Sequence, residues 1–255
     1  MSKLIDCLRH FYGNIEKVII RYDGGASCEC KKEVPPRKFL FFAKVDNALD
    51  SEHHLINSLT NSKRAIDCQI DCTLEAFGIT KLNKNKELEA FVNDFVDKEQ
   101  DIAFKLRIIQ ALGIAPSKLV SEIRMFRHRL EHEYKAPTKQ EVSMALDTAE
   151  LFIIANDSKT SLIEGHLKFI SEKGDLNKRG VDLKYDVENK SFSISILERN
   201  IQPQGHVITN KEVEYYYLIR LINTVKDAFE AKRTLTKLVE IASPEPVRPS
   251  FDLEV

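Results

Sequence analysis

The feature that most constrains this chain is a long run from Phe41 to Phe77 that contains neither glycine nor proline. Within the run, apolar residues recur at the three- and four-residue spacing of one helix face. These residues are Val45, Leu49, Leu55, Leu59, Ile66, Ile70 and Leu74. The pattern predicts one long helix that ends near Gly78, because glycine favours helix termination.

Further helices are expected to follow this run. The expected ranges are 86–112, ended by Gly113, then 117–134, bounded by Pro116 and Pro137, and then a helix that begins at Thr138. Thr138 with Glu141 three residues later is the pattern of a capping box. Four consecutive amphipathic helices with short turns predict an antiparallel helical bundle over residues 41–163.

The chain on either side of the bundle has a different pattern. Residues 1–40 are expected to form an N-terminal extension of a helix, the apolar segment Val18–Ile20 and a loop. The range 164–242 is expected to form a small α+β part, with a strand at His166–Ser171, a hairpin over 180–198 and a helix over 212–241. Residues 243–255 are a proline-rich tail. The predicted fold class is therefore mainly α, a bundle with a small C-terminal α+β part.

Composition excludes several classes of protein. The formal net charge of -1 argues against a protein that coats nucleic acid nonspecifically. No stretch approaches the roughly 20 apolar residues of a membrane helix. Charges at Lys3, Asp6 and Arg9 leave no signal-peptide core. We therefore expect a cytoplasmic protein with no membrane partner.

The cysteines indicate neither a metal nor a disulfide. Five cysteines in a chain without a signal peptide are typical of reduced thiols. Cys28 and Cys30 resemble half of a metal site, but ordinary loop thiols are favoured because no second Cys or His pair stands at a familiar spacing. Cys68 and Cys72 stand four apart on an expected helix and are favoured as core residues. No metal ligand and no cofactor is predicted.

The segment densest in chemical groups is Ile123–Tyr134. Arg124, His128 and His132 are each four residues apart and form one helical stripe. Arg127 lies about 140° round the helix axis from His132, so only its long side chain could reach the same pocket. A solvated charged face is the simplest interpretation. The functional interpretation is that the stripe faces a cleft or a partner, because burial of unpaired polar and charged side chains costs free energy.

The stretch from Arg127 to His132 resembles the Arg-x(4–6)-His signature of the HEPN superfamily (higher eukaryote and prokaryote nucleotide-binding proteins). His128 stands where that family commonly has a polar residue. The signature there ends a helix and precedes a short turn and another helix, and residues 126–154 carry the likeness here. The resemblance implies a HEPN-like antiparallel helical bundle and a metal-independent endoribonuclease.

The resemblance also implies roles for individual residues. RNA carries its own nucleophile, the 2′-OH, so cleavage needs no metal. His132 would be the catalytic acid/base group, because histidine exchanges protons near neutral pH. Arg127 would bind phosphate oxygens in a bidentate manner. The supporting residues are His128, Tyr134, Arg124 and Glu131. Such enzymes act on RNA as homodimers, since one Arg–His pair supplies too few groups for both proton transfers.

His132-Glu133-Tyr134 is similar to the Arg-x4-His-x-Tyr form of HEPN toxins paired with a nucleotidyltransferase antitoxin, which adenylylates the tyrosine. This likeness implies a toxin–antitoxin or antiviral-defence role. An aromatic Tyr134 that closes the helix end at an interface is an alternative. Two other functions stay open: a non-catalytic HEPN nucleotide- or partner-binding dimerisation module, and an unrelated helical protein in which the motif is accidental.

Overall fold

The computed structural model describes residues 2–12, 19–22, 24–49, 51–80, 82, 85–97, 102–116, 118–160, 163, 165–170, 180–197 and 205–242. The chain forms two compact units. One, the bundle unit, comprises Glu29–Thr80 and Val92–Ser161. The other, the sheet unit, comprises Met1–Cys28, Lys81–Phe91 and Leu162–Val255. Among the described helices, none is long and apolar enough to cross a membrane.

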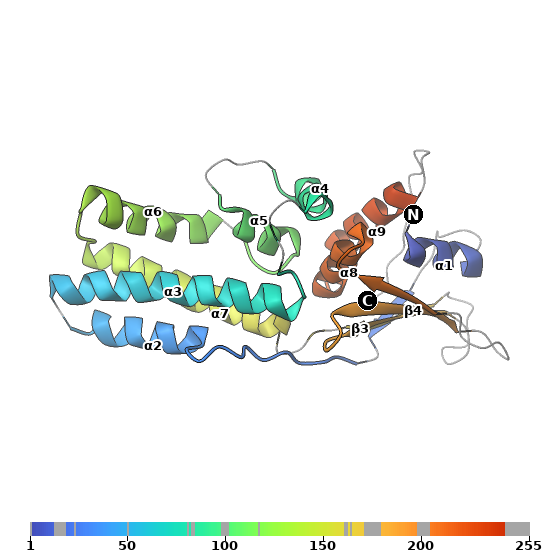
Figure 1. The fold of residues 1–255 in the computed structure, drawn as a ribbon, viewed down its shortest axis with the longest axis horizontal. Helices are drawn as coiled ribbons and strands as arrows, with labels where there is room; N and C mark the ends of the chain where they lie inside the picture. Colours follow the sequence, from blue (N-terminus) through green and yellow to red (C-terminus); the bar gives the residue numbers. More distant parts are fainter. Residues whose placement is uncertain are drawn as a thin grey trace. The chain divides into compact units, whose positions relative to one another are not determined.

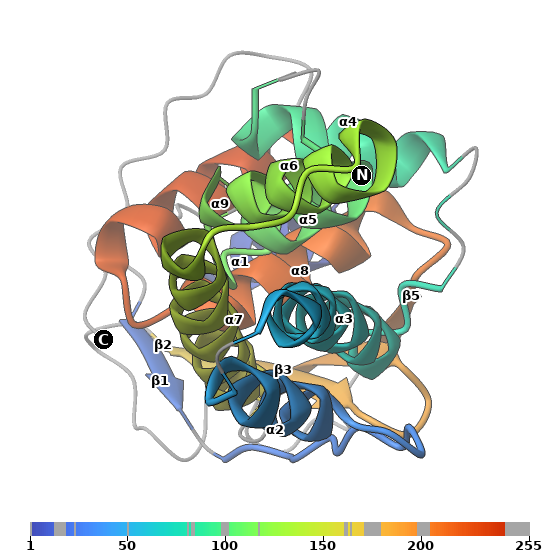
Figure 2. The same cartoon turned by 90° about the vertical axis from the view of Figure 1, so that its left-hand side faces the viewer.

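The bundle unit is built from helices that run alongside one another (Figures 1 and 2). They are α2 (Pro36–Asn47), α3 (Glu52–Ala76), α5 (Phe104–Ala111), α6 (Lys118–Glu133) and α7 (Lys139–Thr160). Helix α3 contacts α2, α5, α6 and α7, and α7 also contacts α2 and α6. A helical bundle was expected in this region, and the chain is mainly α as predicted.

The expected single helix over 41–77 is wrong, because the chain turns back between α2 and α3. Ser51 is extended, with φ -138° and ψ 154°, and occupies the N-cap position of α3. The Ser58 hydroxyl donates to the carbonyl of Ala43 at 2.8 Å, and Asn61 donates to the Asp46 carboxylate at 3.2 Å. These contacts join the two helices across the turn. No glycine or proline marks the break, so tertiary packing decides it.

The expected helix over 86–112 is also interrupted. Helix α4 (Lys86–Phe95) ends before α5 begins at Phe104, and the chain passes from one unit to the other within α4. The predicted helix ends at Gly78 and Gly113 are confirmed. Both glycines have positive φ, 64° and 71°. In each case the next residue donates its N–H to the carbonyl five positions earlier, Ile79 to Leu74 and Ile114 to Ile109, as in a Schellman motif.

The sheet unit contains a five-stranded antiparallel sheet in the order β1-β2-β3-β4-β5. Its strands are β1 (Ile19–Tyr22), β2 (His166–Ile170), β3 (Gly180–Asp186), β4 (Ser191–Leu197) and β5 (Gly205–Thr209). The predicted hairpin of β3 and β4 is confirmed. Its turn forms because the Asp186 carboxylate accepts the N–H groups of Glu188 and Asn189 at 2.9 and 3.0 Å.

Helices α1 (Lys3–Tyr12), α8 (Val213–Thr224) and α9 (Ala228–Ala242) lie on one side of this sheet (Figure 1). Tyr215 of α8 packs on Phe192 of β4 with ring centroids 5.5 Å apart. Tyr217 of the same helix packs on Phe91 at 5.0 Å. This aromatic layer, fully buried, forms the core of the sheet unit.

The observed units differ from the expected domain boundaries. The expected N-terminal extension over 1–40 is divided, because β1 pairs with β2 while the segment from Glu29 onward joins the bundle unit. The expected helix over 212–241 is two helices, since the Asp227 carboxylate accepts the N–H groups of Phe229 and Glu230 and starts α9. Strand β5 was not expected, and the tail over 243–255 lies outside the described residues.

Candidate functional site

The C-terminal end of α6 carries the histidines that the sequence motif singles out. His128 and His132 are both exposed, and their ring centroids lie 4.4 Å apart with the ring planes tilted by 38°. They come together because residues four apart on a helix share one face. The structure therefore brings two of the predicted site residues into one exposed pair of imidazoles.

For the predicted arginines, Arg124 and Arg127, the structure describes only the position of the backbone. Arg124 and Arg127 belong to α6, but their side chains lie outside the described part of the chain. Glu131 is exposed on the same helix. The expected proximity of the Arg127 guanidinium to His132 thus stays a prediction.

Arg129, which the motif did not select, has a different role. Its guanidinium lies 5.2 Å from the centre of the Phe126 ring and forms an ion pair with Glu141 of α7. Glu141 accepts the backbone N–H of Thr138 at 2.8 Å and donates its own N–H to the Thr138 hydroxyl at 3.3 Å. The predicted capping box is confirmed, and through Arg129 it ties the end of α6 to the start of α7.

Tyr134 ends α6 in a left-handed conformation, with φ 53°. The residue is 89% exposed, so the ring is accessible to solvent. The next residue, Lys135, donates its N–H to the Arg129 carbonyl at 3.4 Å and pairs with Glu133 at 2.7 Å. The hydrogen bond from Lys135 holds the pKa of the Glu133 carboxyl below its ordinary value. Tyr134 thus follows His132 by two residues and is exposed in a turn that the contacts of Lys135 with Arg129 and Glu133 hold in place.

The electrostatics of this helix end matter for any anionic ligand. Unsatisfied carbonyls give the C-terminus of a helix a partial negative charge, which disfavours phosphate. A phosphate ligand at this end therefore needs cationic side chains to offset that charge. Arg129 is paired with Glu141, and Lys135 with Glu133. The prediction of a phosphate site therefore depends on the histidines and on Arg124 and Arg127, whose side chains lie outside the described part of the chain.

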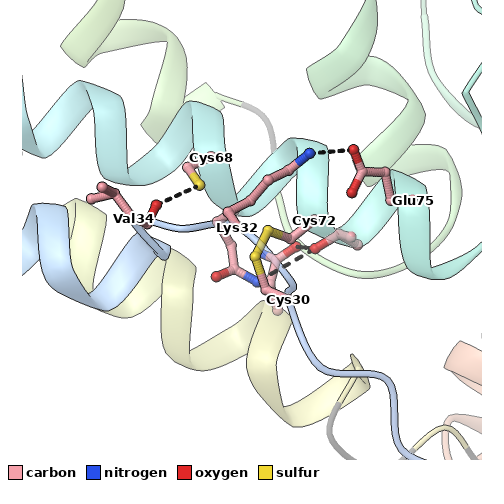
Figure 3. The surroundings of a disulfide bond; sticks show 9 residues. Cys30, Lys32, Val34, Cys68, Cys72 and Glu75 are labelled. Atoms are coloured by element: carbon pink, nitrogen blue, oxygen red, sulfur yellow. Dashed lines mark hydrogen bonds and ion pairs between the residues drawn. A yellow bond between two sulfur atoms is a disulfide. The ribbon is translucent and has the colours of Figure 1, made fainter.

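A second cluster, which the sequence did not predict, lies elsewhere in the bundle unit (Figure 3). Cys30, Cys68 and Cys72 have sulfur atoms that all lie within 4.8 Å of one another. Cys30 and Cys72 form a disulfide. The expectation that all the cysteines are reduced thiols is therefore wrong. The chain before α2 runs along α3 and brings together residues 42 positions apart, which no sequence spacing indicates.

Cys68 is the free thiol of this cluster. Its S–H donates to the Val34 carbonyl at 3.6 Å. Burial raises the pKa of this thiol, and the negative charge of Asp71 adds to the effect. Cys68 is therefore held as a protonated thiol beside the disulfide.

No protein-family model, curated protein or solved structure matches this chain. The resemblance to the HEPN superfamily accordingly rests on the motif in α6 and on the capped turn that leads into α7.

Proposed function

We propose that this chain is a metal-independent endoribonuclease of HEPN type, in which His132 transfers protons and Arg127 binds phosphate. The observation that carries the proposal is the exposed pair of imidazoles, His128 and His132, at the end of α6. Histidine is the side chain best suited to donate and accept protons at neutral pH. The motif resemblance supplies the assignment of Arg127.

The proposed reaction is an internal transesterification. The 2′-oxygen attacks the adjacent phosphorus, the bond from phosphorus to the 5′-oxygen breaks, and the products carry a 2′,3′-cyclic phosphate and a 5′-hydroxyl. One proton leaves the 2′-OH to a base, and one proton reaches the 5′-oxygen from an acid. Arg127 would stabilise the charge on the pentacoordinate phosphorus through two parallel hydrogen bonds.

The geometry of the histidine pair bears on how these protons move. In an in-line displacement the attacking and leaving oxygens lie on opposite sides of the phosphorus. A base and an acid within hydrogen-bonding distance of those oxygens must therefore approach from opposite sides. His128 and His132 of one subunit are adjacent, with ring centroids 4.4 Å apart. In the proposed complex they would therefore approach the phosphate from the same side. This supports a site completed by a second subunit, with His132 of each copy on either side of the RNA.

A role in toxin–antitoxin or antiviral-defence systems follows from the same proposal. Unregulated cleavage of cellular RNA is toxic, so the active site needs control by a partner. Tyr134 is 89% exposed and stands two residues after His132, which suits it as the target of an antitoxin of the nucleotidyltransferase type. Adenylylation there would add a negatively charged phosphate next to the proposed RNA site and repel the substrate.

The test is incubation of the purified full chain with structured RNA, with and without EDTA, followed by analysis of the RNA ends. Cleavage should survive EDTA and leave 2′,3′-cyclic phosphates, and RNA with a 2′-methoxy group at the cut site should resist. His132→Ala should abolish turnover, and Arg127→Lys should be severely impaired because an ammonium cannot form the bidentate contact.

A matched control is available in the same unit. His53 is an exposed histidine of α3 that hydrogen-bonds to Asn57 at 3.0 Å. His53→Ala should leave cleavage unchanged. Cleavage that persists in the His132→Ala, Arg127→Ala double variant would assign the activity to another site. A folded dimer that cleaves no RNA would support the non-catalytic binding module.

A further inference from the structure

The cluster of three cysteines has the composition and spacing of a thiolate metal site. Cys68 and Cys72 stand one turn apart on α3, and Cys30 reaches them from the chain segment that precedes α2 (Figure 3). All three sulfur atoms lie within 4.8 Å of one another. Cys72 is buried and the other two are partly buried, so the cluster is shielded without being closed to solvent.

The spacing can be compared with what a zinc ion requires. Zinc binds thiolates at about 2.3 Å in tetrahedral geometry, which places the sulfur atoms about 3.8 Å from one another. The three sulfurs already lie within 4.8 Å, and the Cα atoms of Cys30 and Cys72 are 5.3 Å apart. No pair of these sulfurs therefore exceeds the separation that zinc requires by more than about 1 Å, and opening the disulfide frees the Cys30 and Cys72 side chains to rotate toward that geometry.

We propose that Cys30, Cys68 and Cys72, when reduced, bind one zinc ion through three thiolates and leave the fourth position open. The disulfide between Cys30 and Cys72 is then the oxidised, metal-free form of the same site. The position of Cys68 distinguishes this site from a simple structural disulfide, because such a disulfide does not need a third sulfur within 4.8 Å.

The surroundings favour a bound cation. Asp67, Asp71 and Glu75 lie on α3 next to Cys68 and act on its sulfur with negative charge. Lys32 pairs with Glu75, and Lys105 pairs with Asp71 at 2.7 Å, so part of this charge is already offset. Three thiolates would add further negative charge, which a divalent cation neutralises locally.

The two forms interconvert in a balanced step. Reduction of the Cys30–Cys72 bond takes two electrons and two protons from a dithiol, which becomes a disulfide in turn. The three thiols then release their protons as zinc binds, because the thiolate is the ligand. Oxidation by a disulfide reverses the exchange and expels the metal. The loop before α2 stays tied to α3 in both forms, by a covalent bond in one and by the metal in the other.

The experiment uses the full chain, reduced with a phosphine that competes weakly for metal and then titrated with Co²⁺ as a spectroscopic probe for zinc. The reduced protein should take up one ion and show thiolate-to-cobalt charge transfer with intense tetrahedral d–d bands. Zinc should displace the cobalt. The oxidised protein should take up none at this site. Reduced, folded protein that binds no metal would overturn the proposal.

Single variants test each ligand. Cys30→Ser, Cys68→Ser and Cys72→Ser should each weaken zinc binding more than about 100-fold, beyond the 10–100-fold typical of changes around a ligand shell. Cys28→Ser is the matched control, because the Cys28 sulfur lies 3.8 Å from the Lys190 ammonium and outside the cluster. Cys68→Ser protein that binds zinc like the parent would show that the third thiol is no ligand.

A second measurement needs no variant. Alkylation of the reduced wild-type chain, read by peptide mass spectrometry, should be slowed by zinc at Cys30, Cys68 and Cys72 and not at Cys28. Equal alkylation of all four with and without zinc would contradict the proposed site. Neither measurement depends on RNA cleavage, so this inference and the proposed function fail independently.

Discussion

Arg129 of α6 forms an ion pair with Glu141 of α7, and the same glutamate closes the capping box with Thr138. The glutamate thus stabilises the start of one helix and holds the end of the preceding one. The histidine pair and Tyr134 stand in or next to the segment between these two anchors. The geometry of the candidate site therefore depends on a residue that takes no part in the proposed chemistry.

Glu141→Ala should lower the free energy of unfolding by about 1–2 kcal/mol, because it removes a cap and an ion pair together. Urea denaturation followed by circular dichroism measures the change. Glu133→Ala is the control, since it removes only the exposed pair with Lys135 and should have a much smaller effect. An equal loss in both variants would show that the link between α6 and α7 is unimportant.

The contribution of Glu141 should also depend on pH. The backbone N–H of Thr138, with Arg129 assisting, holds the pKa of the Glu141 carboxyl below its ordinary value. A carboxyl with a lowered pKa stabilises the fold fully above its unfolded pKa and loses this effect as the pH falls through the folded pKa. The difference in unfolding free energy between wild type and Glu141→Gln should therefore be constant near neutrality and shrink in acid. A difference that grows in acid would have the wrong sign for this mechanism.

Glu214 anchors the N-terminal helix of the sheet unit. Its buried carboxylate accepts hydrogen bonds from the Ser2 hydroxyl at 2.7 Å and from the N–H groups of Lys3 and Leu4 at 2.8 and 2.9 Å. In Glu214→Gln, an NH2 group replaces one of the two accepting oxygens, so a donor would lie against another donor and at least one hydrogen bond would be lost. The free energy of unfolding should fall by about 1–3 kcal/mol.

The control for Glu214 is Lys3→Ala, which keeps the backbone N–H and removes the half-exposed ion pair with Glu212. That change should cost less than about 1 kcal/mol. If both variants unfold at the same urea concentration as wild type, α1 does not depend on the buried carboxylate.

The proposed composite site predicts a two-fold homodimer with His132 of each subunit near the axis. Analytical sedimentation at about tens of micromolar should show a dimer. Excess His132→Ala protein mixed with wild type should lower cleavage per wild-type chain, because mixed dimers lack one of the two histidines. A strict monomer, or activity unaffected by the variant, would contradict the composite site.

Local signals in the sequence determined the helix ends at Gly78 and Gly113, the capped start of α7 and the histidine pair. Gly78 and Gly113 terminate helices because glycine adopts positive φ without strain, and Thr138 with Glu141 caps α7 because both groups lie within one turn. His128 and His132 meet because they stand four apart on a helix. Each of these relationships involves residues within five positions of one another, so the sequence alone predicts them.

Tertiary structure decided the rest. The turn between α2 and α3 has no breaker residue and depends on packing between the two helices, such as the hydrogen bond from Ser58 to Ala43. Strand β1 pairs with β2 across most of the chain, and Cys30 meets Cys72 over 42 positions. Such contacts form only when the path of the chain brings distant segments together, and their free energy comes from burial and pairing that no local pattern encodes.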